Sequence, residues 1–391
     1  MKRKTALVTD QKALLHFDYQ ATTPCDPEVV DAMQPYWFDC WGNASSIQSR
    51  SGLYASAAVG LARDKLAAYL RVNPQRLIFT SGATEANNLA LLGHARARAL
   101  EVGRPGHLIT VATEHQSVID PLIQLQREGF RLTRITPSPD GLLSCDQLLD
   151  AFEIDTILVS VMMANNEIGV LQPLAELGKL CSERGVTFHC DAVQAFGQMY
   201  FDIDKIGIDF LTITGHKIYG PKGIGALVVK SNLPLIPLQW GGGQETGLRS
   251  GTVPVPLAVG FAKAAEITFQ SLEKSQARYL YLRNQLWKRL SLELPDLQLN
   301  GSFDQRLSNN LNFTIPGIKG SSLHRALRSL IQCSNGSACS NGKPSHVLRA
   351  IGRTKEEAEA SIRLSIGRTT TIDHINRAAY LIVKTVRDLR N

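Results

Sequence analysis

A lysine in a glycine-rich turn has the setting that points most directly to chemistry. Lys217 stands in the run Thr214-Gly-His-Lys-Ile-Tyr-Gly-Pro-Lys-Gly-Ile-Gly225, directly after the apolar stretch 210–213. An amine held at a strand end, partly removed from water, is neutral for part of the time and can form a Schiff base. We expect Lys217 to carry that bond rather than Lys222, which lies within the turn. A solvated surface lysine is the ordinary alternative.

Hydroxyl, imidazole and backbone groups in two turns suit a phosphate group. Thr214 and His216 belong to the turn that carries the lysine. A second turn of small residues, Thr80-Ser-Gly-Ala-Thr-Glu85, ends a strand-like run and begins a helix near Ala83. Free N–H groups and the positive end of a helix dipole attract anions there, and Thr84 adds a hydroxyl. We expect a phosphate cradle at Ala83 and Thr84, against the alternative of an ordinary capped turn.

A carboxylate follows another apolar run in the same kind of position. Asp191 comes after the stretch 186–190. A carboxylate there can keep the nitrogen of a pyridine ring protonated, so that the ring accepts electrons. Gln194 follows closely and offers an amide to a ring hydroxyl. Although His189 and Cys190 are of metal-ligand type, no further ligands lie at useful spacing, so we expect no metal site.

A histidine and an asparagine follow two further strand-like runs. His115 comes after 107–111 and can stack on an aromatic ring and move protons near neutral pH. Asn166 comes after 156–162 and can hydrogen-bond a phenolic oxygen or a substrate carboxylate. A surface histidine and an asparagine-rich turn are the ordinary alternatives.

One cysteine has a setting that suits a nucleophile. Cys339 lies in the polar run Ser334-Asn-Gly-Ser-Ala-Cys-Ser-Asn-Gly-Lys-Pro344. A thiol with the ordinary pKa of about 8.5 supplies some thiolate at neutral pH, and thiolate is a strong nucleophile. The seven cysteines are scattered without a C-x-x-C pair, which argues against a disulfide framework or a zinc ribbon. An incidental surface thiol is the alternative, and we expect Cys333 to be buried.

Two arginines and a threonine complete the set of polar candidates. Arg363 and Arg368 frame the stretch Ile362-Arg-Leu-Ser-Ile-Gly-Arg368. A guanidinium fork binds a carboxylate through two parallel hydrogen bonds, so this stretch suits the carboxylate of a substrate. Thr252, in Leu248-Arg-Ser-Gly-Thr252, could donate to a phosphate, including one held by a partner subunit.

Alternating strand-like and helical stretches must position these side chains. The strand-like runs cover 77–80, 107–111, 156–162, 186–190, 210–214 and 226–230, and the helical stretches cover 83–100, 117–128 and 173–184. This alternation predicts a mostly parallel, helix-covered sheet, which binds ligands beyond the carboxyl ends of its strands. A long helix at about 262–292 then leads to a strand-like run at 310–315. We expect a large domain over 15–261 and a smaller α+β domain formed by 1–14 and 262–391.

Composition and charge are those of a soluble globular chain. Of the 391 residues 44% are hydrophobic and 20% charged, and the net charge of +7 is spread over 42 basic and 35 acidic residues. That spread favours a solvated surface over a nucleic-acid-binding stripe. No apolar run approaches the ~20 residues of a membrane span, and the basic start lacks the apolar core of a signal peptide. We expect a cytoplasmic protein without membrane attachment or stable nucleic-acid binding.

Taken together, these motifs resemble the cysteine desulfurases of the NifS/IscS type, in the class V aminotransferase group of fold-type-I pyridoxal-phosphate enzymes. The resemblance runs from Phe17-Asp-Tyr-Gln-Ala-Thr-Thr-Pro24 to Ser365-Ile-Gly-Arg368, with the motifs in the same order. It implies an α/β fold with a mostly parallel seven-stranded sheet, pyridoxal 5'-phosphate as cofactor, and a homodimer. The implied reaction converts L-cysteine to L-alanine and leaves a persulfide on Cys339. The sulfur then passes to an acceptor protein, for iron–sulfur clusters, tRNA thiolation or other thio-cofactors.

The resemblance also implies a role for each candidate residue. Lys217 binds the cofactor and moves protons, His115 stacks over the ring, and Asp191 pairs with the ring nitrogen. The other implied cofactor contacts are Asn166 and Gln194 at the ring substituents and, at the phosphate, Thr84, Thr214, His216 and the neighbouring subunit's Thr252. Asn43, in Trp41-Gly-Asn43, and Arg363 hold the substrate carboxylate.

The chain departs from the family pattern at three places. Gly42-Asn-Ala-Ser-Ser46 stands where the family commonly has Gly-Asn-Pro-Ala-Ser. The loop after Cys339 reaches Pro344 slightly sooner than in housekeeping iron–sulfur members. The chain ends at Asn391, without the C-terminal extension that those members use to dock a scaffold protein.

Two other functions are compatible with the same motifs. A pyridoxal-phosphate C–S lyase would release sulfide, pyruvate and ammonia by β-elimination and would need no nucleophilic cysteine. A non-catalytic regulatory protein could retain the fold alone. The motifs also leave open whether cysteine or selenocysteine is the preferred substrate.

Overall fold

The computed structural model describes residues 14–334 and 344–391. The chain folds into two compact units. Of the described residues, the large unit comprises 22–166 and 170–272, and the small unit comprises 14–21, 167–169, 273–334 and 344–391. Cys339 lies outside the described residues, and so do residues 1–13, which we expected to join the smaller domain.

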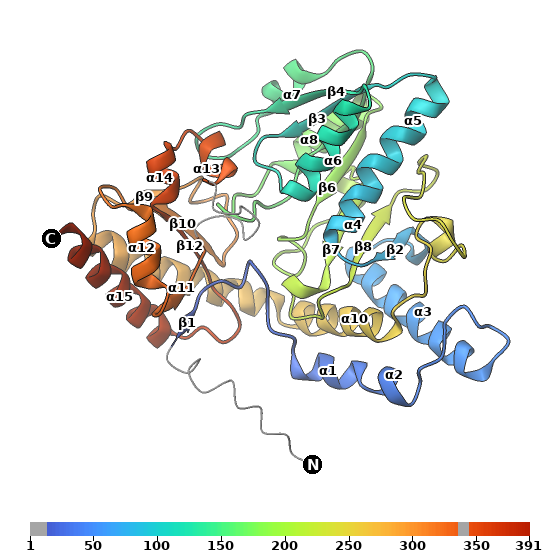
Figure 1. The fold of residues 1–391 in the computed structure, drawn as a ribbon, viewed down its shortest axis with the longest axis horizontal. Helices are drawn as coiled ribbons and strands as arrows, with labels where there is room; N and C mark the ends of the chain where they lie inside the picture. The colour runs from blue at the N-terminus through green and yellow to red at the C-terminus, as the bar shows by residue number, and fades with distance from the viewer. Residues whose placement is uncertain (1–13, 335–343) are drawn as a thin grey trace. The chain divides into compact units, whose positions relative to one another are not determined.

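A seven-stranded sheet forms the centre of the large unit, in the order β2-β8-β7-β6-β5-β3-β4 (Figure 1). Its strands are β2 (Leu77–Thr80), β3 (His107–Val111), β4 (Arg131–Ile135), β5 (Thr156–Ser160), β6 (Thr187–Asp191), β7 (Phe210–Thr214) and β8 (Gly225–Val229). The five strands β7, β6, β5, β3 and β4 run parallel, whereas β8 is antiparallel to both β2 and β7. The predicted α/β fold with a mostly parallel seven-stranded sheet is confirmed.

Helices connect these strands and bury the sheet. They are α1 (Pro27–Met33), α2 (Pro35–Phe38), α3 (Arg50–Leu70), η1 (Pro74–Arg76), α4 (Ala83–Asn88), η2 (Leu89–Gly93), α5 (His94–Val102), α6 (Gln116–Arg127), α7 (Cys145–Ala151), α8 (Leu174–Glu183), α9 (Ile203–Ile206), η3 (Gly215–Lys217), η4 (Glu245–Gly247) and α10 (Val255–Gln270). Leu91 and Leu122 pack against Leu108 of β3 and Leu158 of β5. The predicted helix 83–100 is continuous, but its middle section η2 is a π-helical turn.

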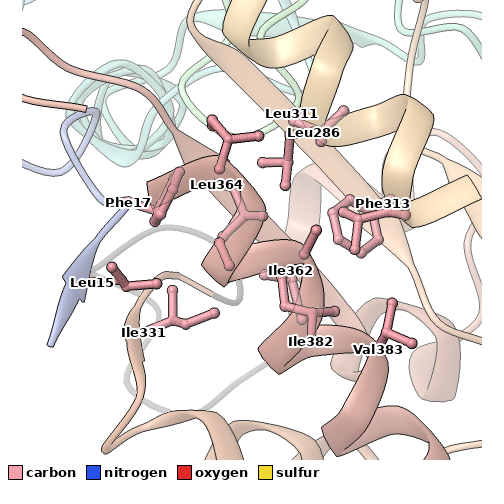
Figure 2. Close-up of a cluster of buried hydrophobic side chains, with 14 of the residues drawn as sticks. Leu15, Phe17, Leu286, Leu311, Phe313, Ile331, Ile362, Leu364, Ile382 and Val383 are labelled. Atoms are coloured by element: carbon pink, nitrogen blue, oxygen red, sulfur yellow. The ribbon is translucent and has the colours of Figure 1, made fainter. Parts of the chain in front are cut away.

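The small unit is built on a three-stranded antiparallel sheet and a separate parallel strand pair. Its strands are β1 (Leu15–His16), β9 (Gln298–Leu299), β10 (Asn310–Thr314), β11 (Ile331–Gln332) and β12 (Ser361–Ser365). Its helices are α11 (Leu272–Glu293, in this unit from residue 273), α12 (Gly320–Leu327), α13 (His346–Ala350), α14 (Lys355–Glu359) and α15 (Ile372–Arg390). Phe17, Leu286, Leu311, Ile362 and Ile382 meet in one buried cluster (Figure 2).

Two features differ from the sequence-based expectations. The long helix expected at 262–292 is two helices, because the chain leaves helical geometry at Ser271 (φ −115°, ψ 7°). Strand β4 was not predicted, because it is an edge strand whose Arg131 and Arg134 face outward. The chain passes between the two units at 21/22, 166/167, 169/170 and 272/273. Phe17 belongs to the small-unit core, whereas α10 packs against α3 and α1 of the large unit.

No helix within residues 14–334 and 344–391 combines the length and apolar character that a membrane span requires.

Buried histidines make folding sensitive to acid. His189 of β6 is fully buried, its Nδ1 lies 2.8 Å from the Ser160 hydroxyl, and burial lowers its pKa to about 3. Burial also lowers the pKa of His94, whose Nδ1 lies 2.9 Å from the Pro234 carbonyl oxygen. A histidine that is kept neutral in the fold takes up its proton only when the chain unfolds, so these residues oppose folding once the pH falls below about 6.5.

We expect the variant His189→Gln to unfold with a weaker pH dependence than the wild type. Between pH 6.5 and 5, His189 alone should lower the free energy of unfolding by about 2 kcal/mol, or about 1.4 kcal/mol for each pH unit. Urea unfolding at pH 7 and pH 5 measures this difference. The control is His374→Gln, because His374 is exposed and glutamine can keep the capping box of α15. Equal pH dependence in wild type and His189→Gln would contradict the assignment.

Candidate functional site

The predicted site residues of the large unit follow neighbouring strands at one edge of the sheet. β3, β5, β6 and β7 are adjacent and parallel, so their carboxyl ends coincide. His115 follows β3 and Asn166 follows β5, whereas Asp191 ends β6 and Lys217 follows β7 in η3. Gln194 lies in the loop after Asp191 and is buried. The sheet therefore brings these five candidates to the same edge.

The two phosphate-type turns also lie at this edge. Because β8 is antiparallel to both neighbours, β2 runs in the direction of β7, and Thr80, Gly225 and Thr214 are in register. A Cβ on Gly225 would lie 2.8 Å from the carbonyl carbon of Gly82, so this position requires glycine. The turn before Ala83 and Thr84 thus lies against the start of β8, next to the strand that leads to Lys217.

The turn that carries the lysine is held by backbone hydrogen bonds. The N–H groups of Ile218 and Gly220 both donate to the Gly215 oxygen at 3.0 Å. Tyr219 is in the left-handed region (φ 65°), and its N–H donates to the Thr23 hydroxyl at 2.8 Å. A Cβ on Gly220 would lie 2.8 Å from the Gly215 oxygen. These contacts fix the backbone on both sides of Lys217.

His216 and Thr214 already have partners within the large unit. The Nδ1 atom of His216 lies 3.1 Å from the Thr22 hydroxyl. Burial, helped by the positive charges of Lys217 and Lys222, lowers the pKa of His216 to about 4, so the ring is neutral at physiological pH. The Thr214 hydroxyl donates to the Ile224 oxygen at 2.9 Å. To donate to a phosphate oxygen, the Thr214 hydroxyl would have to turn away from Ile224.

The beginning of α4 is braced by an ion pair. Glu85 accepts a hydrogen bond from the Ser81 N–H at 2.7 Å and pairs with the Arg249 guanidinium at 2.8 Å. Burial opposes ionisation of Glu85, but the hydrogen bonds from Arg249 and Ser81 outweigh it and lower its pKa. Thr84 itself is exposed, and so is Thr252 in the segment that follows Arg249.

A second brace joins the loops after β3 and β5. The amide nitrogen of Asn165 donates to the Thr113 oxygen at 2.8 Å, and the Met162 N–H donates to the Glu114 carboxyl at 2.6 Å. Glu114 is fully buried, and burial raises its pKa well above its usual range. A carboxyl whose protonated form is favoured by burial therefore lies directly before His115, and Asn165 lies directly before Asn166.

Asp191 and His115 are connected through two side chains that the sequence pattern does not single out. Both carboxylate oxygens of Asp191 accept hydrogen bonds, one from the Val193 N–H at 3.0 Å and one from the Asn87 amide at 2.8 Å. The same amide nitrogen donates to the Ser117 hydroxyl at 2.9 Å, which lies 2.8 Å from Nδ1 of His115. Asn87 lies one helical turn after Thr84 on α4, and this helical spacing is the signal that could have found it.

In the small unit, the predicted carboxylate ligand is buried and paired. Arg363 of β12 lies 2.6 Å from the Asp18 carboxylate. Its backbone pairs in both directions with Ser334, the last described residue before the segment that contains Cys339. On the other side of that segment, Ser345 caps α13 and donates to the Glu167 carboxylate. Asn43, the other predicted carboxylate ligand, is exposed in the large unit.

Four of the described cysteines have a raised pKa, which makes them poor nucleophiles. Burial raises the pKa of Cys181 and of Cys333 to about 12, and it raises the pKa of Cys190 well above its usual range. The pKa of Cys25 is raised as well, by burial and by Asp26. Within the described ranges, no three His, Cys, Asp or Glu residues are grouped so that they could hold a metal ion.

Comparison with known proteins identifies relatives along nearly the whole chain. The family model described as "Aminotransferase class-V" matches residues 15–378. The curated protein "Cysteine desulfurase IscS" of Ehrlichia chaffeensis is 45% identical over 378 residues, which cover 95% of this chain and 91% of that protein. The protein of the same name from Rickettsia rickettsii is 43% identical over 380 residues, which cover 96% and 92%.

Solved structures show the same likeness. One described as "NIFS-LIKE PROTEIN" has a TM-score of 0.88 at 31% identity and covers 96% of this chain and 99% of its own. Another, "SspA in complex with cysteine", has a TM-score of 0.79 at 36% identity and covers 90% and 98%.

We expect Gly220→Ala and Gly60→Ala to change stability in opposite directions. A methyl group on Gly220 meets the Gly215 oxygen, which should lower the free energy of unfolding by about 1–3 kcal/mol. Gly60 lies inside α3 with open space around its Cβ direction, so alanine there should raise stability by about 0.5–1 kcal/mol. Urea unfolding measures both changes. A neutral Gly220→Ala would show that the lysine turn can move without loss of stability.

Proposed function

From the premise that this chain belongs to the class V aminotransferase family and is a cysteine desulfurase, we propose that it binds pyridoxal phosphate on Lys217 and transfers the sulfur of L-cysteine to Cys339. The observation that carries this proposal is the pairing of two chemically matched groups at neighbouring strand ends. Asp191, a buried carboxylate held by two N–H donors, ends β6, and Lys217 follows β7.

The residues at this edge fit the cofactor chemically. A carboxylate with fixed orientation can accept the N–H of a pyridinium ring, because each of its oxygens has lone-pair capacity beyond the hydrogen bond that it already accepts. Asn166 and Gln194 would contact the ring substituents, and His115 would stack over the ring. Ala83, Thr84, Thr214 and His216 would hold the phosphate, joined by the partner subunit's Thr252.

Each of these groups has a task in the reaction. Bound to a lysine amine, pyridoxal phosphate supplies an electron sink for negative charge at the substrate Cα. Asp191 keeps the ring nitrogen protonated, which strengthens that sink. Lys217 and His115 move protons to and from the substrate. Arg363 and Asn43 hold the substrate carboxylate, so that the Cβ–S bond is presented in one orientation.

Cys339 takes the sulfur in this proposal. Its thiolate attacks the sulfur atom of the substrate, and an S–S bond forms as the Cβ–S bond breaks. The electron pair of the broken bond stays with carbon, which is protonated to give alanine. Cys333 and Cys181 are poorer candidates for this role, because burial raises the pKa of each thiol to about 12.

The proposal includes a homodimer. Large apolar side chains are exposed along the segment from α1 to α3, where a soluble monomer would ordinarily have few. They are Trp37, Phe38, Trp41, Ile47, Leu53 and Tyr54. A second copy of the chain would cover this surface and would bring its own Thr252 to the phosphate. We infer a cytoplasmic location and a sulfur-acceptor protein as partner, with iron–sulfur cluster assembly, tRNA thiolation or another thio-cofactor as the destination.

Product analysis tests the roles of Lys217 and Cys339 separately. We expect Lys217→Ala to lose the visible absorbance band of the bound cofactor and all turnover. Cys339→Ser should keep the band, shift it on addition of L-cysteine, and form no alanine above background. Cys145→Ser, in α7, serves as the cysteine control and should behave as wild type. If Cys339→Ser released sulfide and pyruvate at the wild-type rate, the C–S lyase reaction would replace our proposal.

Conservative arginine variants test whether Arg363 holds the substrate carboxylate. Arg363→Lys keeps the charge but loses the two-pronged geometry, so we expect the KM for L-cysteine to rise about tenfold or more while the affinity for pyridoxal phosphate is unchanged. Steady-state alanine formation and equilibrium dialysis measure the two quantities. Arg368→Lys is the comparison. A larger rise in KM for Arg368→Lys would assign this role to Arg368.

A further inference from the structure

A buried asparagine that has no assigned role lies between two groups of the proposed cofactor site. Asn87 of α4 is fully buried, and its amide nitrogen contacts both the Asp191 carboxylate and the Ser117 hydroxyl. We propose that Asn87 is a positioning residue that fixes the Asp191 carboxylate and, through Ser117, the His115 ring in the orientations that pyridoxal phosphate requires. The inference rests on the proposed function, since it assigns a support to two of its residues.

The orientation of the Asn87 amide follows from its partners. An ionised carboxylate can only accept hydrogen bonds, so the NH₂ group and not the oxygen must face Asp191. That group has two hydrogens, and two acceptors lie within reach, Asp191 at 2.8 Å and Ser117 at 2.9 Å. Both hydrogens are therefore used, and the amide cannot turn without losing both bonds.

This orientation sets the direction of the hydrogen bonds that lead to His115. The Ser117 hydroxyl accepts from Asn87, which leaves its own proton for Nδ1 of His115, 2.8 Å away. The Ser117 N–H also donates to Nδ1, at 3.1 Å. Two donors directed at Nδ1 leave no place for a proton there, so the neutral ring carries its proton on Nε2. Asn87 thus helps to select the tautomer of the ring that would lie over the cofactor.

The side-chain oxygen of Asn87 argues against a purely structural role for this residue. Among residues 14–334 and 344–391, the buried oxygen of Asn87 has no hydrogen-bond partner. A buried acceptor without a partner is unfavourable for folding, and an apolar side chain of the same size would avoid that penalty. What an apolar residue could not supply is the pair of donors. The contact with Asp191 and Ser117 is therefore the reason to retain an amide at this position.

The position of Asn87 on α4 links the phosphate turn to Asp191. Thr84, a proposed phosphate ligand, lies one helical turn earlier on the same helix. The helix that begins at the phosphate turn therefore also braces the carboxylate that would pair with the ring nitrogen. One rigid element would then support both ends of the cofactor.

A double-mutant cycle on cofactor affinity tests the inference. The variants are Asn87→Leu, Asp191→Ala and the combination, and the probe is pyridoxal phosphate, titrated into the cofactor-free full-length chain and followed by its visible band and by equilibrium dialysis. We expect Asn87→Leu to raise the Kd for pyridoxal phosphate at least about tenfold in the wild-type background, because the variant loses one hydrogen bond to a charged group. In the Asp191→Ala background the same change should alter the Kd less than about twofold.

Controls separate this effect from general damage to the helix. Asn88→Leu removes the neighbouring amide of α4, which donates to the Thr84 backbone oxygen and not to Asp191, and should alter the Kd less than about twofold. Circular dichroism of the cofactor-free variants checks that they fold. An equal rise in Kd for Asn87→Leu in both backgrounds, or no rise in either, would overturn the inference. If Asp191→Ala itself left the Kd and the band unchanged, the proposed cofactor site would fall first.

Ser117→Ala tests the hydrogen bonds that lead from Asn87 through Ser117 to His115. It leaves the bond between Asn87 and Asp191 in place, so the Kd for pyridoxal phosphate should change less than about twofold. It removes a donor that favours the neutral His115 ring, so the acid limb of the pH profile for alanine formation should move to higher pH by about one unit or less. An unchanged pH profile would show that Asn87 acts on Asp191 alone.

Discussion

The parallel pairing of β3, β5, β6 and β7 is the constraint from which the site follows. Parallel neighbours must end at the same edge, and each must be followed by a connection that returns to the other edge. His115, Asn166, Asp191 and Lys217 are far apart in sequence, yet the pairing brings them to one line. The antiparallel strand β8 extends this edge to β2, so that the turn before α4 lies there too. The segments that connect these strands could therefore differ in length or sequence without changing the order of the polar groups along the edge of the sheet.

The polar groups at this edge are mostly buried, and several of them hydrogen-bond to one another. Glu114 receives the Met162 N–H, and Asn165 donates to the Thr113 oxygen. Such contacts are strong in a dry environment and unfavourable to leave incomplete. They link the loops after β3 and β5, and Asn87 and Ser117 link Asp191 to His115 in a similar way. The precision of the site thus depends on residues that lie behind it.

The sequence predicted the elements whose patterns are regular and the residues that directly follow them. Asp191 and Lys217 were selected as candidates because each follows a strand-like, mostly apolar run, and the sheet that these runs predict is present. The edge strand β4 was missed because its arginines hide the pattern, and the break at Ser271 was missed because both neighbouring helices have continuous apolar faces. Asn87 was not selected, because its partners are distant in the chain and only the folded sheet brings them together; its helical spacing from Thr84 was the available signal.

The π-helical turn η2 joins α4 to α5 without a loop. It therefore sets the directions in which the side chains of α5 point relative to those of α4. A residue in an α-helix advances the side-chain direction by about 100°, so the wider turn shifts every later position relative to Asn87. Removing one residue from Leu89–Gly93 could restore regular α-helical bonding, but it would rotate either the face that reaches Asp191 or the face that buries Ala95 in the core. The segment is therefore intolerant of length changes for a reason unrelated to the identity of its side chains.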